Sequence, residues 1–588
     1  MRKRRALIFT LIASGLAAAF ATGANPASTS PPVGPYEELR VRVPMRDRVW
    51  LSTNVFHPTG TGRFPTILIR TPYGKGTSLL PNYRAFVDRG YVVVVQDVRG
   101  RYESEGVFSP LTQEASDGDD TLNWIAAQPW SDGKIGMTGG SYLGIAQWKL
   151  AVLNNPHLKA IFPVVSGCDD YRDRFYSPGG AMKLGHRLLW MSENLRRPGF
   201  VPDFTKFIWR LPVRAADLAA TGQELPVYRA SMDHPSDDDY WKSVSTREHI
   251  KDIHIPVFAV GGWYDNYVES DLVAFETLHK NGGLNRVLIG PWPHNMSIPF
   301  KGISFGVDSS LPIRRFQLQW FDHWLKGLDT PVMSQPPIEI FVMGANIWRQ
   351  ENEWPLARTQ HVRYYLESNG HANSMFGDGS LGLSPQSRSV PDQYTYDPMK
   401  PVPTMGGAVC CNPTVFPWGP MDQRPVEKRH DVLVYTSAPL REDLEVTGQV
   451  RVVLRASSNA PDTDFTAKLV DVFPTGEARN LTDGILRARY RESLEKPKLM
   501  KFGEIYRIEI DAGVTSNVFL KGHSIRVEIS SSNFPRFDRN LNTGQLVEDE
   551  VQVRRADQVI YHDKIHHSYV LLPVIPRSRN LVAKLRAH

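Results

Sequence analysis

Residues 134–144 have the sequence KIGMTGGSYLG, and an apolar helical stretch follows them. The first five are typical of a buried strand, the glycine pair of a tight turn, and the residues after Ser141 of a helix. Small residues flank the serine because so sharp a turn excludes bulky side chains, and the N–H groups of the helix start can hold an oxyanion. The stretch predicts a nucleophile elbow, although Leu143 occupies the position of the second glycine of a strict GxSxG pattern, which comes here at Gly144.

Short apolar runs alternate with helical segments on both sides of this stretch. Such runs indicate strands buried on both faces, and their alternation with helices indicates a mostly parallel α/β sheet. Ser116 or Asp117 is expected to cap a helix that continues to Ala127, and the amphipathic stretch from Pro312 to Gly327 predicts the last helix of this part. The strands are expected at residues 66–69, 91–95, 160–165, 256–260 and 286–289.

The rest of the chain differs from this pattern in two places. Between residues 168 and 245, aromatic side chains are scattered among Arg, Asp and Pro without strand patterns, which indicates a helical insertion. From residue 336 to 588, apolar and polar residues alternate, as in Tyr506–Ile510, which indicates an antiparallel sandwich or jelly roll. Residues 36–167 and 246–330 are therefore assigned to the α/β domain.

Two polar residues follow predicted strands in the order that a Ser–Asp–His hydrolase requires. Asp265 follows the strand at 256–260 and His294 the strand at 286–289. Ser141 would attack the substrate, His294 would accept and return its proton, and Asp265 would orient the imidazole. Asp265 alone is equally compatible with a loop carboxylate, and His294 alone with a surface imidazole, but all three coincide at strand ends in the required order.

The spacing of these residues also locates the insertion. Ser141 and Asp265 are 124 residues apart, about twice what two βαβ crossovers need. The excess is the helical insertion, which we expect to cover the strand ends, where open α/β sheets bind their ligands.

Composition and charge exclude several classes of protein. The chain has 588 residues, of which 41% are apolar and 22% charged, so it is a folded protein of about two to four domains. Four positive charges lie at residues 2–5 and account for most of the net charge of +6, which leaves +2 without a polybasic block. We therefore expect no nucleic acid partner.

The amino terminus is typical of an export signal. A basic segment is followed by an apolar stretch from Ala6 to Ala21 and by small residues where a signal peptidase would cut, which predicts a signal peptide at residues 1–24. The protein is therefore expected in the periplasm or outside the cell, with no stable membrane span. Arg4-Arg5 resembles a twin-arginine signal, but such pairs also occur by chance, so the export route stays open.

Three cysteines and the absence of metal or nucleotide motifs limit the chemistry further. Cys410 and Cys411 can form a vicinal bridge, one of them can pair with Cys168, or all three can stay reduced. No CxxC, HExxH, EF-hand, P-loop or supported GxGxxG motif occurs, so we expect no metal and no cofactor.

Six motifs together resemble the CocE/NonD hydrolases, which include cocaine esterase, Xaa-Pro dipeptidyl peptidases, α-amino acid ester hydrolases and glutaryl-cephalosporin acylase. The resemblance implies an α/β-hydrolase domain, a helical cap and a C-terminal jelly roll like that of the dipeptidyl peptidases. It also implies that Ser141, Asp265 and His294 form the family triad. The motifs are RTPY at 70–73, DVRG at 97–100, GGSYLG at 139–144, GWYD at 262–265, GPWPH at 290–294 and SSSNFPRFD at 530–538.

The same resemblance assigns roles to residues near the triad. Tyr73 matches the tyrosine whose hydroxyl joins a backbone N–H, here that of Tyr142, in an oxyanion hole. A phenol is a directional donor, which suits that role. Tyr267 matches a pocket aromatic beside the acid, and simple packing explains it equally well. Asp97 and Arg99 are interpreted as structural residues of the neighbouring turn.

We conclude from the sequence that the protein is a serine hydrolase that cleaves an ester or amide bond of a small molecule or short peptide. The alternatives are an Xaa-Pro dipeptidyl peptidase and a cephalosporin-type acylase or α-amino acid ester hydrolase. A non-catalytic binding protein that uses its jelly roll is a further alternative of a different class. The sequence leaves the oligomeric state and the natural substrate open.

The residues after the expected acid bear on the choice among these alternatives. The α-amino acid ester hydrolases bind the substrate ammonium partly through acidic residues directly after the triad aspartate. Here these positions are Asn266, Tyr267 and Val268, which carry no charge. We therefore expect no requirement for a free α-amino group, unless the insertion supplies a carboxylate. The candidates for that carboxylate are Asp169, Asp170 and Asp173.

Overall fold

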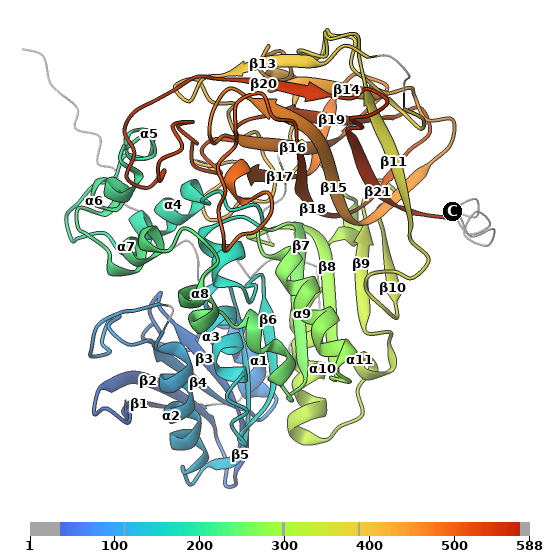
Figure 1. Ribbon diagram of the computed structural model, residues 1–588. Coiled ribbons are helices and arrows are strands. Elements are labelled where there is room, and N and C mark those ends of the chain that lie inside the picture. The colour runs from blue at the N-terminus through green and yellow to red at the C-terminus, as the bar shows by residue number, and fades with distance from the viewer. Residues whose placement is uncertain (1–35, 111, 297–299, 301, 386–388, 577–588) are drawn as a thin grey trace, which may run out of the picture.

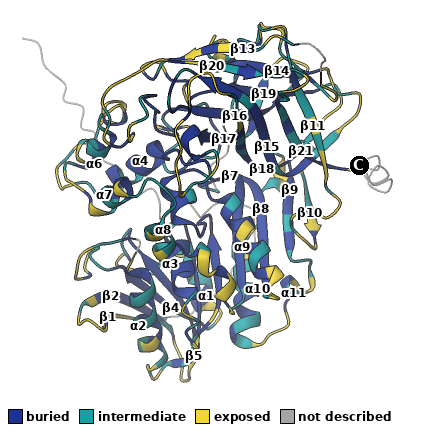
Figure 2. Cartoon of the chain, viewed as in Figure 1, coloured by how far each residue is buried: buried dark blue, intermediate teal, exposed yellow. Residues whose placement is uncertain are grey.

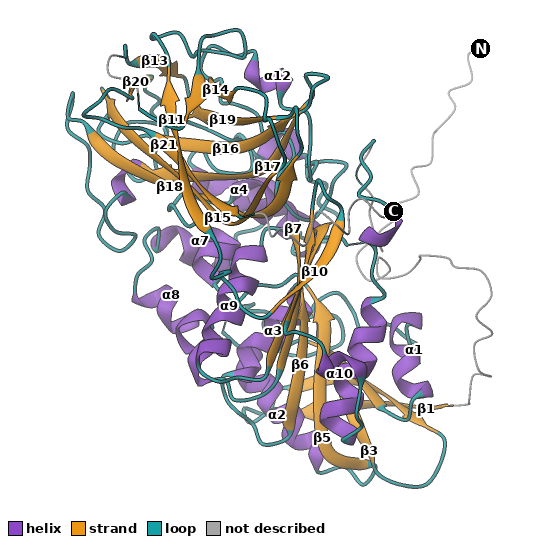
Figure 3. Cartoon of the chain, turned by 90° about the vertical axis from the view of Figure 1, so that its right-hand side faces the viewer, coloured by secondary structure: helices purple, strands orange, loops and turns teal. Residues whose placement is uncertain are grey.

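The structure is a computed structural model that describes residues 36–110, 112–296, 300, 302–385 and 389–576 (Figure 1). The signal peptide expected at residues 1–24 lies outside these residues. The described strands form two sheets, one of ten strands and one of eleven. Figure 3 shows the two sheets as separate layers, with helices packed around the first. In the described part of the chain, no helix is both long enough and apolar enough to cross a membrane.

The first sheet is mixed and has a parallel centre, as the alternation of strands and helices predicts. Its order is β1-β2-β4-β3-β5-β6-β7-β8-β9-β10, in which β3 to β9 are parallel and the pairs at both edges are antiparallel. The strands are β1 (Tyr36–Pro44), β2 (Trp50–Pro58), β3 (Phe64–Thr71), β4 (Val92–Asp97), β5 (Ser131–Gly140), β6 (Leu158–Val164), β7 (Val257–Tyr264), β8 (Asn285–Pro293), β9 (Ile338–Val342) and β10 (Ile347–Glu351).

Helices cover both faces of this sheet because its central strands are apolar on both sides. Val92 and Val94 of β4 pack in one core with α2, α3 and α9, whereas Val93 and Val95 pack in another with α1 and α10. Figure 2 shows the strands mostly buried and the exposed residues on loops and outer helix faces. The helices are α1 (Pro81–Asp88), α2 (Glu114–Ala126), α3 (Tyr142–Ala151), α9 (Val268–Lys280), η4 (Val307–Ser309), α10 (Ile313–Lys326) and α11 (Pro331–Ser334).

The ends of two helices test the capping expectations. Helix α10 begins after Pro312 and ends at Gly327, which has the left-handed conformation of a C-cap, as predicted. Helix α2 begins earlier than expected, since Gln113 is its N-cap and Ser116 and Asp117 lie inside its first turn. Asp117 therefore does not cap the helix, and its carboxylate instead pairs with the guanidinium of Arg99 at 2.6 Å.

Between β6 and β7 the chain forms a helical insertion with its own apolar cluster. Tyr171, Phe175, Leu188, Tyr228 and Trp241 are among its buried members. In Figure 1 these helices lie between the first sheet and the all-β part. They are η1 (Asp170–Phe175), α4 (Leu184–Asn194), α5 (Phe204–Phe207), η2 (Val213–Ala215), α6 (Ala216–Thr221), α7 (Pro226–Asp233), α8 (Asp239–Val244) and η3 (Arg247–Asp252).

The second sheet is formed by the C-terminal part, where the period-two pattern predicts strands with one buried face. Ile508 and Ile510 are fully buried, whereas Glu509 between them is only partly buried and Arg507 before them is exposed. The pairing is antiparallel except between β12 and β14. The elements are β11 (Gln360–Glu367), β12 (Ser380–Gly382), β13 (Asp392–Tyr396), α12 (Arg424–Glu427), β14 (Leu433–Ser437), β15 (Leu444–Ser458), β16 (Asp464–Val472), β17 (Ala478–Arg487), η5 (Ala488–Tyr490), β18 (Tyr506–Phe519), β19 (Ser524–Ser530), β20 (Ala556–Tyr561) and β21 (Tyr569–Ile575).

The domain boundary expected at residue 336 differs from the observed strand pairing. Strand β9 hydrogen-bonds in parallel to β8, and β10 pairs with β9, so residues 338–351 extend the first sheet. A short hairpin with alternating burial fits the edge of either sheet, and the sequence pattern does not say which one it joins.

Candidate active site

Ser141 lies at the turn between β5 and α3, as the sequence predicts. It has a φ of 57°, a left-handed value that is rare for a residue with a side chain. Gly139 is required in front of it because its φ is 140° and an added Cβ would lie 2.5 Å from the Cβ of Leu143. Gly144 has a similar role, since an added Cβ would lie 2.5 Å from the Cβ of Ser166. The turn therefore exposes the serine hydroxyl at the carboxyl edge of the sheet.

The two expected partners of Ser141 lie beside it. Asp265 directly follows β7 and His294 directly follows β8, and these neighbouring parallel strands end at the same edge. His294 Nε2 is 3.0 Å from Ser141 Oγ, and His294 Nδ1 is 2.7 Å from Asp265 Oδ1. Asp265 is fully buried, so its interaction with the imidazole is shielded from water. The structure brings these three residues into one hydrogen-bonded chain.

Tyr73 also lies near the serine, two residues after the end of β3. The indole Nε1 of Trp190 is 3.1 Å from its hydroxyl oxygen. Burial raises the pKa of Tyr73 to about 12. The phenol therefore keeps its proton at neutral pH and can donate it to a hydrogen-bond acceptor.

Tyr142, the first residue of α3, lies next to this group. Its backbone N–H is at the start of the helix, where N–H groups lack intrahelical partners. Its buried side chain donates a hydrogen bond to Oε1 of Glu114 at 2.7 Å. The ring is thus fixed by a contact to α2, which restrains the turn that holds Ser141.

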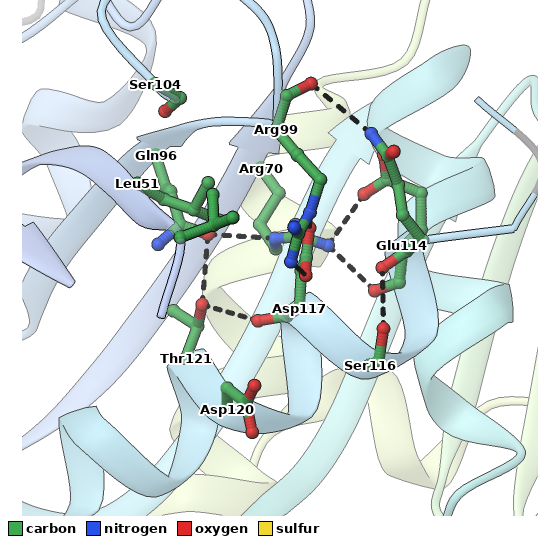
Figure 4. A network of polar contacts seen from close by, with 12 residues as sticks. Leu51, Arg70, Gln96, Arg99, Ser104, Glu114, Ser116, Asp117, Asp120 and Thr121 are labelled. Atoms are coloured by element: carbon green, nitrogen blue, oxygen red, sulfur yellow. Dashed lines mark hydrogen bonds and ion pairs between the residues drawn. The ribbon is translucent and has the colours of Figure 1, made fainter. Parts of the chain in front are cut away.

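Glu114 belongs to a buried polar network below the site (Figure 4). Arg70 donates to Glu114 Oε2 at 2.6 Å and to Gln96 Oε1 at 2.9 Å, and neither charged group is exposed. Arg99 donates one hydrogen bond to Asp117 and another to Asp47, each 2.6 Å long. These contacts connect α2 to the turn between β1 and β2. These contacts support the interpretation of Arg99 as a structural residue.

Asp97 has a local role of the same kind. It accepts a hydrogen bond from the backbone N–H of Lys75 at 2.6 Å, which fixes the loop that follows Tyr73. Burial raises the pKa of Asp97 to about 6.

Two cavities meet at Ser141 and Tyr73. The larger has a volume of about 150 Å³ and is lined by His294, Leu143 and apolar residues of the first sheet. The smaller has a volume of about 30 Å³, and His294 does not line it. Tyr267 lines the smaller cavity, with its ring centroid 5.6 Å from that of His294. The sequence-based position of Tyr267 beside the site therefore agrees with the geometry.

Several residues of the smaller cavity were not predicted to be near the site. Arg174, Arg187 and Trp190 come from the helical insertion, and a Cys410–Cys411 disulfide comes from the C-terminal part. Of the alternatives left open for the cysteines, the structure has the vicinal bridge, and Cys168 is free and buried. The adjacent cysteines were a signal for the bridge, but nothing in the sequence placed them near a serine about 270 positions earlier.

Comparison with known proteins connects this geometry to a family. Residues 47–296 match the X-Pro dipeptidyl-peptidase (S15) family, and residues 330–571 match the X-Pro dipeptidyl-peptidase C-terminal non-catalytic domain. A cocaine esterase from Rhodococcus sp. (strain MB1 Bresler) is 40% identical over 91% of this chain and 98% of its own length. The chain belongs to the CocE/NonD family of serine hydrolases.

Solved structures of CocE/NonD relatives extend this similarity to the whole fold. An α-amino acid ester hydrolase superposes with a TM-score of 0.82 at 25% identity, covering 94% of this chain and 98% of that one. A CocE/NonD family hydrolase from Staphylococcus aureus, at 21% identity, superposes with a TM-score of 0.68 over 92% and 94% of the two chains and shows the fold alone. The protein is therefore an enzyme, a hydrolase with a catalytic α/β domain and a C-terminal all-β domain, rather than a binding protein.

Proposed function

We propose that this hydrolase cleaves carboxylic ester or amide bonds through an acyl-enzyme formed on Ser141. The observation that carries the proposal is the chain from Asp265 through His294 to Ser141, with contacts of 2.7 and 3.0 Å. His294 Nε2 takes the Ser141 proton as Oγ attacks the carbonyl carbon, and Asp265 stabilises the imidazolium that forms. The imidazolium then protonates the leaving group, and a water molecule activated by the same base releases the acid.

The negative charge that develops on the substrate oxygen needs donors that are already in place. The Tyr73 hydroxyl and the backbone N–H of Tyr142 flank Ser141 and supply them in this proposal. Because Asp265, His294 and the side chain of Tyr142 are buried around them, these donors act in a partly desolvated site and need little rearrangement during the reaction.

We further propose roles for the parts around the α/β domain. The insertion at residues 168–245 acts as a helical cap, since it supplies Arg187 and Trp190 to the wall of the smaller cavity. The C-terminal all-β part is a jelly roll that closes the same cavity with Cys410 and Cys411. Both parts thereby contribute to substrate selection.

The two cavities receive different halves of the substrate. The leaving atom must lie near the general acid, so the leaving group occupies the larger cavity, which His294 lines. The acyl group then extends into the smaller cavity, beside Tyr267.

The charges around the smaller cavity disfavour an acyl group with a free amine. Arg174 and Arg187 line it, and no carboxylate is among its described lining residues. Of the insertion residues that were candidates to bind an ammonium, Asp170 is bound to Lys149 and Arg174, and Asp169 pairs with Arg247 at 3.3 Å. Asp173 accepts a hydrogen bond from the backbone N–H of Asp169 at 2.9 Å. An ammonium placed there would lose its hydration without gaining a carboxylate partner.

A substrate panel tests this proposal. The kcat/KM of p-nitrophenyl butyrate is compared with that of the p-nitrophenyl ester of 2-aminobutyrate and with a free-amine Xaa-Pro p-nitroanilide. The two esters have acyl groups of similar size, and we expect a higher kcat/KM for the neutral ester than for the amino ester. A preference of a hundredfold or more for either amine, about 2.7 kcal/mol, would show that an ammonium site exists.

We also propose that residues 1–24 direct export, as their basic segment and apolar stretch suggest. Expression of the full chain in a bacterial host, followed by amino-terminal sequencing of the protein in periplasm and medium, tests this. An uncleaved amino terminus in the cytosolic fraction contradicts it.

A further inference from the structure

Trp190 of α4 contacts the side chains of the two residues that the proposed function assigns to the oxyanion hole. Its indole Nε1 lies 3.1 Å from the hydroxyl oxygen of Tyr73. Its ring is stacked on that of Tyr142, with centroids 6.3 Å apart and planes inclined by 3°. Trp190 is therefore one of the residues through which the insertion contacts the reacting centre.

The chemistry of the two side chains fixes the direction of the Trp190–Tyr73 hydrogen bond. An indole N–H can only donate, whereas a phenol hydroxyl carries one proton and can also accept. Trp190 must therefore donate and Tyr73 must accept. The single proton of Tyr73 is left for another acceptor, and the hydroxyl lines the same two cavities as the reacting Ser141.

Accepting a hydrogen bond also makes the phenol a stronger donor. Hydrogen bonds in a chain polarise one another, and the effect is larger in a buried site. The Tyr73 hydroxyl would therefore point its proton toward the reacting carbonyl and donate it more strongly as charge develops there. This effect increases from the ground state to the transition state, so it acts on kcat more than on KM.

The position of Trp190 is itself held by its neighbours. Asn194 donates a hydrogen bond to its carbonyl oxygen at 2.8 Å, and Arg187, one turn earlier on α4, lies 6.0 Å from its ring. The same Arg187 donates two hydrogen bonds to the carbonyl of Arg174, at 2.7 and 3.0 Å. The backbone of Trp190 is thus held within the insertion, while its indole contacts Tyr73 and Tyr142 of the α/β domain.

We propose that Trp190 is a positioning residue of the oxyanion hole, whose indole N–H occupies the acceptor side of the Tyr73 hydroxyl so that the phenol proton is donated to the oxyanion. The proposal rests on the proposed function, because it requires Tyr73 to be an oxyanion donor. It gives the insertion a part in the chemical step in addition to its part in the cavity wall.

A double-mutant cycle on a p-nitrophenyl ester tests the inference. Trp190→Phe keeps an aromatic ring for stacking and removes the donor, and we expect kcat to fall about tenfold, or about 1.4 kcal/mol, with KM within about twofold. In a Tyr73→Phe background the same change should have no further effect on kcat, because the hydroxyl that it acts on is gone. Trp209→Phe, in an exposed part of the insertion, is the matched control and should leave kcat and KM unchanged.

The possible outcomes are distinguishable. If Trp190→Phe lowers kcat equally in both backgrounds, Trp190 only shapes the cavity and the inference is wrong. If it leaves kcat unchanged while Tyr73→Phe lowers it, the inference is wrong but the proposed oxyanion hole stands. If Tyr73→Phe itself leaves kcat unchanged, both fail. Thermal unfolding of each variant identifies a loss of activity that comes from misfolding.

Discussion

Replacement of Asp265 by Asn removes a charge from the triad with little change in shape. The carboxylate is fully buried and 2.7 Å from His294 Nδ1. With the charges of carboxylate and imidazolium about 4 Å apart and an effective dielectric constant of about 20, their attraction is about 4 kcal/mol. Its loss corresponds to about 10³ in rate. Asn can also donate to Nδ1 and favour the wrong tautomer of the imidazole, so we expect kcat to fall by about 10³ to 10⁴.

The assay is the steady-state kcat of a p-nitrophenyl ester, with Asp271→Asn as control. Asp271 is also buried and lies near Asp265, but burial and the charge of Asp265 raise its pKa well above the usual range, which favours the neutral carboxyl. Exchange of a neutral carboxyl for an amide should change kcat by less than about threefold. A kcat of Asp265→Asn within about thirtyfold of wild type would refute the reasoning, as would an equal loss in Asp271→Asn.

Two further predictions concern the groups around the triad. Tyr73→Phe should keep the fold and lower kcat by about 10²–10³ with little change in KM, because the hydroxyl stabilises the charge that develops in the transition state. Steady-state kinetics that show a change in KM alone would contradict this. Arg70→Met should lower the free energy of unfolding by about 3–5 kcal/mol, since it leaves the buried Glu114 without its main partner. As a control, Arg46→Met at an exposed ion pair should lower the free energy of unfolding by less than about 1 kcal/mol. Burial raises the pKa of Glu114 and the charge of Arg70 opposes this, so removal of Arg70 raises that pKa further. The loss in Arg70→Met should therefore grow as the pH rises from 5 to 8, and urea titrations that show equal losses for both variants would contradict this prediction.

The sequence predicted the centre of the molecule because local signals determine it. Gly139 and Gly144 are needed by the turn itself, and apolar runs such as that of β4 are needed by strands buried on both faces. Since parallel strands end at one edge, the order of Ser141, Asp265 and His294 along the chain was enough to expect them together.

The parts that the sequence did not predict depend on contacts between distant segments. Trp190 and Arg187 are ordinary members of an aromatic and charged segment until the packing of α4 places them beside Tyr73. The Cys410–Cys411 bridge reaches the site only through the docking of the C-terminal part. The pairing of β9 with β8 was not expected, because alternation of burial does not identify a strand's partner.

Covalent labelling tests the central proposal, that Ser141 is the nucleophile, most directly. The protein is treated with a fluorophosphonate and digested, and the modified peptide is identified by mass spectrometry. We expect one adduct, on Ser141, and Ser141→Ala should fold normally, take up no label and lose about 10⁶ in kcat. A folded Ser141→Ala protein that still takes up the label, or that retains turnover close to that of wild type, would contradict the account.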